Sequence, residues 1–562
     1  MCRRLRANDP LNSSFSPALL CLLWAAAVFV VPGVAAGQTA TAPPVNTAGS
    51  FRVAGTIVSK TDAHPLGRAR VTLRDAKNPG QFESVITGEN GKFAFENVPA
   101  GKYSLTGAKH GFITASYDQH DQYSTAIVTG SGIATEALVL KIAPNAVIAG
   151  KVLDEAGEPV RHATVTLYYD DHQEGVDQIQ ARNVAQTDDL GAYDLPNLIP
   201  GTYFLSVRAT PWYAVHPPED SEGPKSEIAV DRSLDVAYPV TYYTDATDSD
   251  GATAIPVQGG ERLQVDMHLN PVPALHLLVH VPGDNKHGFI FPRLEQPSFD
   301  GSTFIPANGG RMVSPGVFEI SGIPAGHYNL RIHGQAADTQ MKGVDVNKNG
   351  EQVDAAAAEV TASLKLSVHA PEETALPKGL TVALRSKGRS FAGLNRLDEK
   401  GEGEIADIPA GNYEVVVFGS RKRYSIAHML AEGAEVSGHR LTLAPGASAS
   451  ASLRLVAGSV EVDGVVKKAG TCLAGAMVVL VPKDPEGNRD LFRRDESDLD
   501  GTFSLHDVVR GSYVLLAIEN GWDLDWSQPA VIAAYSKHGR AIVVSDAAKQ
   551  LNLAEPIQVQ SK

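Results

Sequence analysis

Aromatic residues that could bind sugars fall in two short segments of the chain. Trp212 and Tyr213 are adjacent, and Trp522 and Trp526 enclose two aspartates. Flat aromatic rings stack on the apolar faces of sugar rings, while neighbouring carboxylates accept hydrogen bonds from hydroxyl groups. These residues therefore predict two carbohydrate-binding loops. The alternative is that the same rings cover the open end of a β-sandwich.

An acidic segment offers the ligands of a calcium site. Asp245, Asp248 and Asp250 precede a glycine, and alternating carboxylates on a tight loop suit a hard cation that takes several oxygen ligands. The segment lacks the Glu that an EF-hand places six residues after its glycine, because Val257 stands there. A second acidic segment, 495–500, is explained by a turn that is repeated along the chain. Calcium at the first segment is the one cofactor hypothesis, and no other cofactor is expected.

Catalytic motifs are scarce in this sequence. The spelling His-x-x-Glu occurs at His216 and at His369, and with 17 histidines such spellings arise by chance. Both contain proline and are expected in loops, whereas a catalytic zinc needs a third ligand and a base on a rigid scaffold. The chain has no Gly-x-Ser-x-Gly elbow and no Gly-Lys-Ser/Thr phosphate loop. We therefore expect no catalytic residues and no enzyme activity.

A repeated pattern organises the rest of the sequence. Glycine, nine further residues, glycine, one residue and tyrosine recur five times. Five matches of this length indicate five copies of one structural unit. The repeated positions are Gly91, Gly101 and Tyr103, then Gly191, Gly201 and Tyr203, then Gly316, Gly326 and Tyr328, then Gly401, Gly411 and Tyr413, and finally Gly501, Gly511 and Tyr513.

Each copy has the residues of short β-strands joined by turns. Phe93 and Phe95 alternate with polar or small neighbours, as in a half-buried strand. Turn-forming residues before Gly91 predict a β-hairpin, and the segment 99–101 predicts a second turn into the strand of Tyr103. The tyrosine is expected in the core, with its hydroxyl on a backbone group near the sheet edge.

The fold class follows from the density of strands and turns. About seven short strands per copy, without any sustained helical period, predict an all-β chain. We expect a tandem array of about five small antiparallel β-sandwich domains, Ig-like or prealbumin-like. The expected domains are 51–143, 144–271, 272–360, 361–455 and 456–562, of which the third and fourth are divergent.

The strand and turn motifs carry a family resemblance. An opening Gly-x-Val strand, an Ala-x-Val-x-Leu strand, and Thr-Asp-x-x-Gly and Pro-x-Gly-x-Tyr turns resemble carboxypeptidase regulatory-like domains. Residues 147–203 match best, although Tyr193 replaces the Phe of the pattern. The resemblance implies a prealbumin-like or carbohydrate-binding-like fold in an exported bacterial protein of several repeats. It implies no single function, because such modules serve as spacers, binders and accessory domains.

The first 37 residues have the order of a signal peptide. Three early arginines precede an apolar run over 19–31, and small residues lie before Gln38. The apolar run is shorter than the roughly 20 residues that span a bilayer, and a retained anchor is the alternative. We expect a secreted or periplasmic protein with a linker over 38–50 and no membrane span after cleavage. Only Cys472 then remains, so no internal disulfide is expected.

Charge and repeat together bound the function. The formal net charge of −15 argues against a nucleic-acid partner. The sequence predicts a non-catalytic exported multi-domain protein for extracellular interaction, adhesion or structural spacing. The alternative is a carbohydrate-binding protein that uses the aromatic loops of the second and fifth domains. The expected partner is an extracellular protein or polysaccharide.

Overall fold

A computed structural model describes most of the chain after the expected signal segment. The described residues are 50–172, 175, 177–217, 231–281, 291–305, 308–333, 340–354, 359–370, 376–386, 391–418, 424–545 and 549–562. The expected signal segment 1–37 and positions 38–49 of the expected linker lie outside them. So do Glu219 and Glu372, which complete the two His-x-x-Glu spellings.

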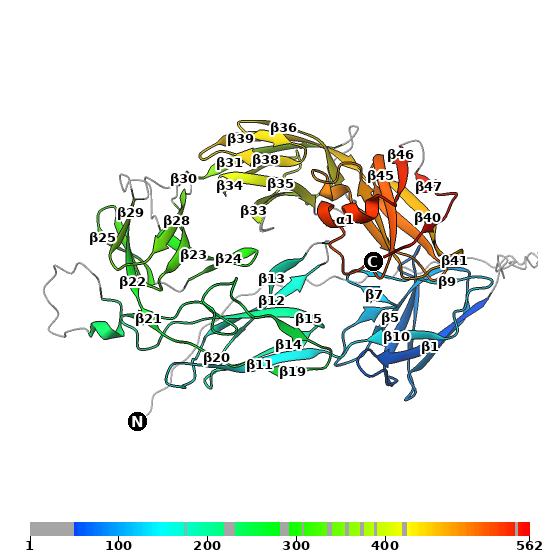
Figure 1. The fold of residues 1–562 in the computed structure, drawn as a ribbon, viewed down its shortest axis with the longest axis horizontal. Coiled ribbons are helices and arrows are strands. Elements are labelled where there is room, and N and C mark those ends of the chain that lie inside the picture. The colour runs from blue at the N-terminus through cyan, green and yellow to red at the C-terminus, as the bar shows by residue number, and fades with distance from the viewer. Residues whose placement is uncertain are drawn as a thin grey trace, which may run out of the picture. The chain divides into compact units, whose positions relative to one another are not determined.

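The first unit shows the plan that the other units share (Figure 1, dark blue). One sheet has an opening strand between an antiparallel and a parallel neighbour, and the other is built around two central antiparallel strands; their inward residues form one core between the sheets. The first sheet is β10 (Leu138–Ile142), β1 (Phe51–Ser59) and β4 (Lys92–Val98). The second is β3 (Phe82–Ile86), β2 (Arg70–Asp75), β5 (Gly101–Ala108), β6 (Ala115–Ser116) and β9 (Ile127–Thr129), and β7 (Gln119–His120) pairs β8 (Tyr123–Ser124).

The second unit repeats this plan with two extra short pairings. Its first sheet is β14 (Ala192–Leu198), β11 (Ala146–Leu153), β19 (Arg262–Gln264) and β20 (Met267–His268). Its second sheet is β13 (Gln178–Gln186), β12 (Thr164–Asp171), β15 (Gly201–Arg208), β17 (Thr241–Tyr242) and β18 (Ile255–Val257). A 3-10 turn, η1 (Arg232–Leu234), precedes β16 (Val236–Ala237), which pairs β21 (Val272–Pro273).

The third and fourth units keep the two-sheet plan despite their divergent sequences. The third unit has β25 (Asn308–Ser314), β26 (Val317–Ile323), β22 (Leu275–His280) and β29 (Glu351–Asp354) in one sheet, and β24 (Gly301–Phe304), β23 (Phe291–Ser298), β27 (Gly326–His333), β28 (Gln340–Val346) and β30 (Glu359–Val360) in the other. The fourth has β34 (Glu402–Ile408), β31 (Ala362–His369), β39 (Ser448–Ala457) and β36 (Tyr424–Glu432) in one, and β33 (Phe391–Arg396), β32 (Thr381–Arg385), β35 (Gly411–Phe418), β38 (Arg440–Leu443) and β37 (Glu435–Ser437) in the other.

The fifth unit adds a helix to the same plan (Figure 1, orange to red). Its first sheet is β41 (Thr471–Cys472), β40 (Val460–Lys468), β44 (Thr502–Val508), β47 (Gln550–Asn552) and β48 (Ile557–Gln558). Its second is β43 (Arg493–Glu496), β42 (Met477–Pro482), β45 (Gly511–Glu519), β46 (Arg540–Val544) and β49 (Gln560–Ser561), with the 3-10 turn η4 (Arg489–Leu491) before β43. The helix α1 (Pro529–Ser536) packs Ile532 against this sheet, and no helix among the described residues could cross a membrane.

The all-β sandwich prediction is confirmed, and one feature of the pairing is new. In every unit the last strand of the first sheet runs parallel to the opening strand, as β10 does to β1 and β39 does to β31. The other pairings are antiparallel, except that β49 runs parallel to β45 in the fifth unit. Because the last strand pairs with one edge of the opening strand and an antiparallel strand pairs with the other, the opening strand has a neighbour on both edges.

The predicted hairpin at the first glycine of the repeat is wrong in four of the five units. The strand before Gly91, β3, pairs with β2, while the strand after it, β4, pairs with β1 in the other sheet. The turn therefore carries the chain from one sheet to the other. Only the third unit has the hairpin, where β25 and β26 flank Gly316 and pair with each other. Alternation of polar and apolar residues identifies a strand but does not say which sheet it joins.

The first glycine is required by its backbone and by its neighbour. In the five units its φ lies between +66° and +83°, a region that favours glycine. Its carbonyl accepts a hydrogen bond from the backbone at the opening strand, as Ile57 donates to Gly91 over 2.9 Å and Val466 to Gly501 over 2.8 Å. A Cβ on Gly91 would lie 2.6 Å from the carbonyl oxygen of Ile57. The glycine thus lets the sheet-to-sheet turn sit against the opening strand.

The expectation for the repeated tyrosine is confirmed in all five units. Each side chain is buried, and each hydroxyl donates to the carbonyl of the residue four positions earlier. The distances are 3.1 Å for Tyr103 to Pro99, 2.8 Å for Tyr203 to Ile199, 2.7 Å for Tyr328 to Pro324, 2.5 Å for Tyr413 to Pro409 and 2.7 Å for Tyr513 to Val509. The hydroxyl fastens the turn before the strand, and burial raises the pKa of Tyr203 and of Tyr513 to about 12.

Candidate functional site

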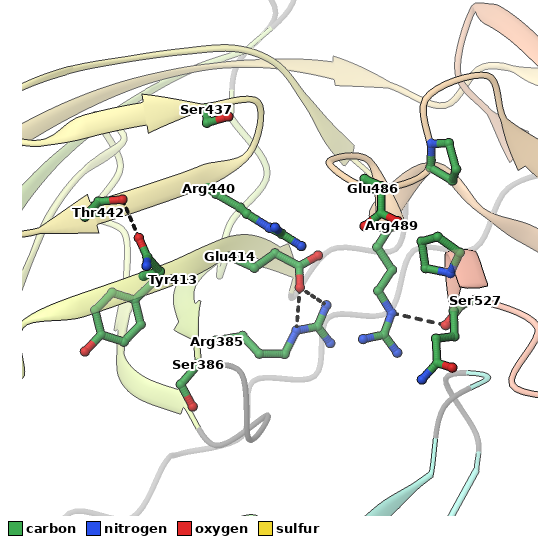
Figure 2. Close-up of a pocket in the computed structure, with 14 residues that line it drawn as sticks. Arg385, Ser386, Tyr413, Glu414, Ser437, Arg440, Thr442, Glu486, Arg489 and Ser527 are labelled. Carbon is green, nitrogen blue, oxygen red and sulfur yellow. Dashed lines mark hydrogen bonds and ion pairs between the residues drawn. The ribbon is translucent and has the colours of Figure 1, made fainter. Parts of the chain in front are cut away.

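A polar pocket lies between the fourth and fifth units (Figure 2). Its volume is about 500 Å³, which is large enough for a small polar ligand. The fourth unit contributes residues of β32, β35, β37 and β38, and the fifth contributes the segment around η4 and the start of α1. The pocket is therefore built from two units.

Three guanidinium groups give the pocket its charge. Figure 2 shows Arg385 and Arg440 beside the carboxylate of Glu414, with Arg489 facing them from the fifth unit. Arg385 is buried, and its Nε and Nη2 each lie 3.1 Å from Glu414 Oε2. Glu486 is the second acidic residue of the lining. Arginine matches planar anions such as carboxylates, so the excess of guanidinium groups favours an acidic ligand.

Hydroxyl and amide groups complete the lining. Arg489 Nε donates to Ser527 Oγ over 3.1 Å, and Thr442 donates to the side-chain amide oxygen of Asn412. Beside the pocket, His439 Nδ1 lies 3.1 Å from Asp490 Oδ1 and links the two units. Burial lowers the pKa of His439, but the hydrogen bond and charge of Asp490 outweigh it and raise that pKa. The wall between the units is thus held by a charged pair.

The fifth unit also contacts the first. Asp498 lies 2.6 Å from Lys102 Nζ and accepts a hydrogen bond from the backbone of Ala126 over 3.1 Å. Arg494 reaches Asp121 Oδ2 over 3.1 Å. The backbone of Leu499 donates to the carbonyl of Ala126 over 3.0 Å, and its side chain packs against the core of the first unit. The repeated acidic turn of the fifth unit is therefore a docking element.

The second and third units meet at a buried histidine. His276 Nδ1 lies 2.7 Å from Glu319 Oε1, and its Nε2 lies 2.9 Å from Asp235 Oδ2 of the second unit. Asp235 Oδ1 is also 2.8 Å from His216 Nδ1. Burial lowers the pKa of His276, but its hydrogen bonds to Glu319 and Asp235 outweigh burial and raise it. The histidine of one His-x-x-Glu spelling, His216, thus belongs to an ion-pair network between units.

The predicted aromatic platforms differ sharply in exposure. Trp212 is 84% exposed, with the ring of Tyr213 edge-on to it at 5.8 Å. Trp526 is 5% exposed, because it packs in an apolar cluster of the fifth unit and against Gly175 of the second. Trp522 is half-buried against His120. The prediction that Trp522 and Trp526 form an open sugar platform is therefore wrong, whereas Trp212 and Tyr213 remain available to a ligand.

The acidic residues predicted as calcium ligands are exposed in a turn. Asp248 Oδ1 accepts a hydrogen bond from the backbone of Gly251 over 2.8 Å, and Asp245 has a φ of +63°. The structure does not gather Asp245, Asp248 and Asp250 into one set of neighbouring ligand atoms among the described residues. Calcium binding there stays a prediction.

A different group of side chains could hold a metal ion. Ligand atoms of His172, Asp177 and Asp525 lie within 4.8 Å of one another. The first two belong to the segment between β12 and β13, and Asp525 belongs to the segment after β45. In the sequence, Asp525 stood out because it lies between two tryptophans. No motif around His172 or Asp177 indicated that these two residues would lie beside Asp525.

Comparison with known proteins agrees with the fold. The family model described as carboxypeptidase regulatory-like domain matches residues 52–129 and 147–218, so the predicted resemblance is confirmed for the first two units. No curated protein matches the chain. The matched segments end before the third unit.

Similar solved structures include two streptococcal pilins and a protein of Bacillus anthracis. A minor pilin of Streptococcus agalactiae is 14% identical, over 40% of this chain and 96% of that chain, with a TM-score of 0.21. A streptococcal ancillary pilin is 12% identical, over 54% and 98%, with a TM-score of 0.19. The Bacillus anthracis TIE protein is 10% identical, over 73% and 74%, with a TM-score of 0.17. Scores this low support no inference about ligands or partners.

Proposed function

We propose that this chain is an exported, non-catalytic protein whose five sandwich units form a preassembled scaffold for extracellular interaction and spacing. One observation carries the proposal: the first and fifth units are joined by hydrogen bonds and ion pairs, among them Ala126 to Asp498 and Arg494 to Asp121. Units that merely followed one another on flexible linkers would not bury charged groups against distant partners. The array holds its binding surfaces in fixed relation.

The titratable groups support a structural role for the junctions. His276, Arg494 and Asp498 are each buried and each paired across a junction between units. Buried charges are costly unless they are paired, so these groups hold the scaffold together. In this proposal these charged groups stabilise the contacts between units, and ligands bind to loops and to the pocket between the fourth and fifth units.

Paired spin labels test the preassembled scaffold. The labels are attached to cysteines that replace exposed Lys77 of the first unit and exposed Lys537 of the fifth. The free and exposed Cys472 is replaced by serine so that it takes up no label. We expect one narrow distance distribution in the full chain. A variant with Lys102→Glu and Arg494→Ala should broaden it. A distribution that is already broad without those changes would contradict the scaffold, and an unprocessed N-terminus inside the cytoplasm would contradict export.

Carbohydrate binding is the second candidate function, and the arginine-lined pocket favours an acidic polysaccharide. Alginate and polygalacturonate serve as acidic probes, and dextran serves as a neutral one. Exposed Arg440 lines the pocket, so Arg440→Ala should weaken binding of the acidic probes. Arg454→Ala, exposed on β39 of the same unit, is the matched control. Equal binding by both variants and the wild type would remove the pocket from consideration, and Trp212→Ala tests the exposed aromatic pair separately.

A further inference from the structure

We propose that His172, Asp177 and Asp525 form a binding site for a divalent first-row metal ion, which ties the second unit to the fifth. The three ligand atoms lie within 4.8 Å of one another. One imidazole nitrogen and carboxylate oxygens are the donor set that such ions take in proteins. The site joins two units that the chain itself does not connect directly.

The geometry already brings two of the three ligands to a metal-binding separation. His172 Nε2 lies 3.2 Å from Asp525 Oδ1. A tetrahedral ion with ligand bonds of about 2.1 Å holds its ligand atoms about 3.4 Å apart. The backbone of Asp177 donates to Asp525 Oδ1 over 3.1 Å, which fixes that carboxylate beside the imidazole. Small side-chain movements would close the site around an ion.

A carboxylate behind the imidazole completes the arrangement. His172 Nδ1 lies 3.8 Å from Asp121 Oδ2 of the first unit, and Arg494 holds the same oxygen at 3.1 Å. In protein metal sites the ring nitrogen that does not bind the ion commonly faces a carboxylate, which keeps the proton on that nitrogen. Asp121 is placed to do this, and His172 Nε2 makes no hydrogen bond among the described residues.

The balance of charge is a separate observation. Asp170 interacts electrostatically with Asp177, Asp525 and His172, and its Oδ1 is buried without a hydrogen-bond partner among the described residues. With Asp121, four carboxylates therefore lie around one imidazole. A buried carboxylate oxygen with no partner is costly, and a divalent cation nearby would offset that cost by neutralising the excess negative charge. Asp170 is not among the three residues whose ligand atoms lie within 4.8 Å of one another, so it acts on the ion through its charge.

The donor set favours zinc or a similar ion over calcium. Calcium takes six to eight oxygen ligands, whereas this site offers a nitrogen and few oxygens. Because the ion binds an unprotonated imidazole nitrogen and ionised carboxylates, protons compete with it, and its affinity should fall as the solution becomes acidic. The backbone N–H of Ser527, two residues after Asp525, donates to the carbonyl of Gly175 over 3.1 Å, so the ion would reinforce an existing contact.

Zinc content and cobalt spectra of the full chain test the proposal. We expect the wild type to retain one equivalent of zinc after gel filtration, and to give intense visible bands with cobalt that report a tetrahedral site with nitrogen ligation. His172→Gln and Asp525→Asn should each lower zinc affinity at least tenfold. Because His327 forms an exposed pair with Asp345 at 2.6 Å in the third unit, His327→Gln is the matched control for adventitious binding.

The zinc content of the variants either supports or overturns the metal site. Loss of zinc in the His172 and Asp525 variants, with retention in the His327 variant and unchanged circular dichroism, supports the site. Zinc that binds equally to all variants, or no zinc retained by the wild type, overturns it. Should His172→Gln fail to fold, Asp525→Asn and Asp170→Asn, measured by the same cobalt spectra, still decide between the two.

Discussion

The imidazole of His120 stacks on the indole of Trp522, with ring centroids 3.9 Å apart and ring planes 16° from parallel. His120 Nδ1 also lies 3.2 Å from Glu496 Oε2, a fully buried carboxylate of the fifth unit. The histidine comes from the small two-stranded β7–β8 extension of the first unit. A tryptophan that the sequence suggested for a sugar is thus an internal contact between the two ends of the described chain.

Removing the Trp522 ring should loosen this junction. Trp522→Ala loses the stacked contact with His120 of the first unit, and we expect a loss of about 1–3 kcal/mol in the free energy of unfolding. Chemical denaturation of the full chain measures it. Trp212→Ala removes a ring that is 84% exposed and should change stability by less than about 0.5 kcal/mol. Equal losses in both variants would show that the stacking contributes nothing.

The tyrosine hydroxyl should contribute separately from the tyrosine ring. Tyr513→Phe removes only the hydrogen bond to the carbonyl of Val509, and we expect a cost of about 1 kcal/mol. Tyr513→Ala also removes a buried ring from the core and should cost about 3–5 kcal/mol. Denaturant midpoints followed by tryptophan fluorescence compare the two. A phenylalanine variant as stable as the wild type would show that the turn holds without the hydroxyl.

Alanine at the first glycine of a repeat should be costlier than alanine at an open turn. Gly91→Ala forces a side chain into a left-handed backbone and places its Cβ 2.6 Å from the Ile57 carbonyl oxygen, so we expect a loss above about 2 kcal/mol. Gly132 has a φ of +85° but no atom within 4 Å of its Cβ position. Gly132→Ala should therefore cost only the backbone strain, about 1 kcal/mol. Thermal unfolding of both variants separates the cost of backbone strain, which both share, from the cost of the close Cβ contact, which only Gly91→Ala has.

The junction of the second and third units should weaken as pH rises. The folded protein raises the pKa of His276, so protonation stabilises the fold: the contribution is complete below the unfolded pKa of about 6.5 and disappears as the pH passes the raised folded value. The groups that face it are Glu319 and Asp235, which are joined in turn by Arg311 and His216.

A titration of His276 by NMR, together with stability measured from pH 5 to 9, checks this expectation. The variant His276→Gln should flatten the pH dependence of stability over that window, because the uncharged amide cannot gain or lose the proton. His327→Gln, in an exposed pair of the same unit, should leave the dependence unchanged. A folded pKa of His276 below its ordinary value would reverse the predicted sign.

The sequence predicted the units because their determinants are local. Alternating residues around Phe93, the glycine of a tight turn and the tyrosine beside Pro99 each act within a few positions of one another. The sheet that each strand joins depends on partners elsewhere in the unit, and for that reason the hairpin at Gly91 was predicted wrongly. The helix α1 was missed because it is short and has no clear apolar stripe.

The junctions could not be predicted from local pattern at all. Trp526 is buried because Gly175, in another unit, leaves room for its ring. Asp525 likewise lies beside a residue of another unit, His172. The pocket of Figure 2 is lined by Arg385 of the fourth unit and by Arg489 of the fifth. A single sequence contains no periodic signal for contacts between folded units, since each side alone reads as an ordinary polar loop.

The contact between the fifth unit and the first can form only late in the synthesis of residues 51–562. A ribosome makes residues 51–143 long before it reaches Asp498, so Lys102 and the backbone of Ala126 lack this partner until residue 498 has been synthesised. Any product that ends early, by a nonsense codon or by proteolysis, leaves that face uncovered. Docking of the fifth unit thus covers a face of the first unit that a protease would reach in any product that lacks residue 498.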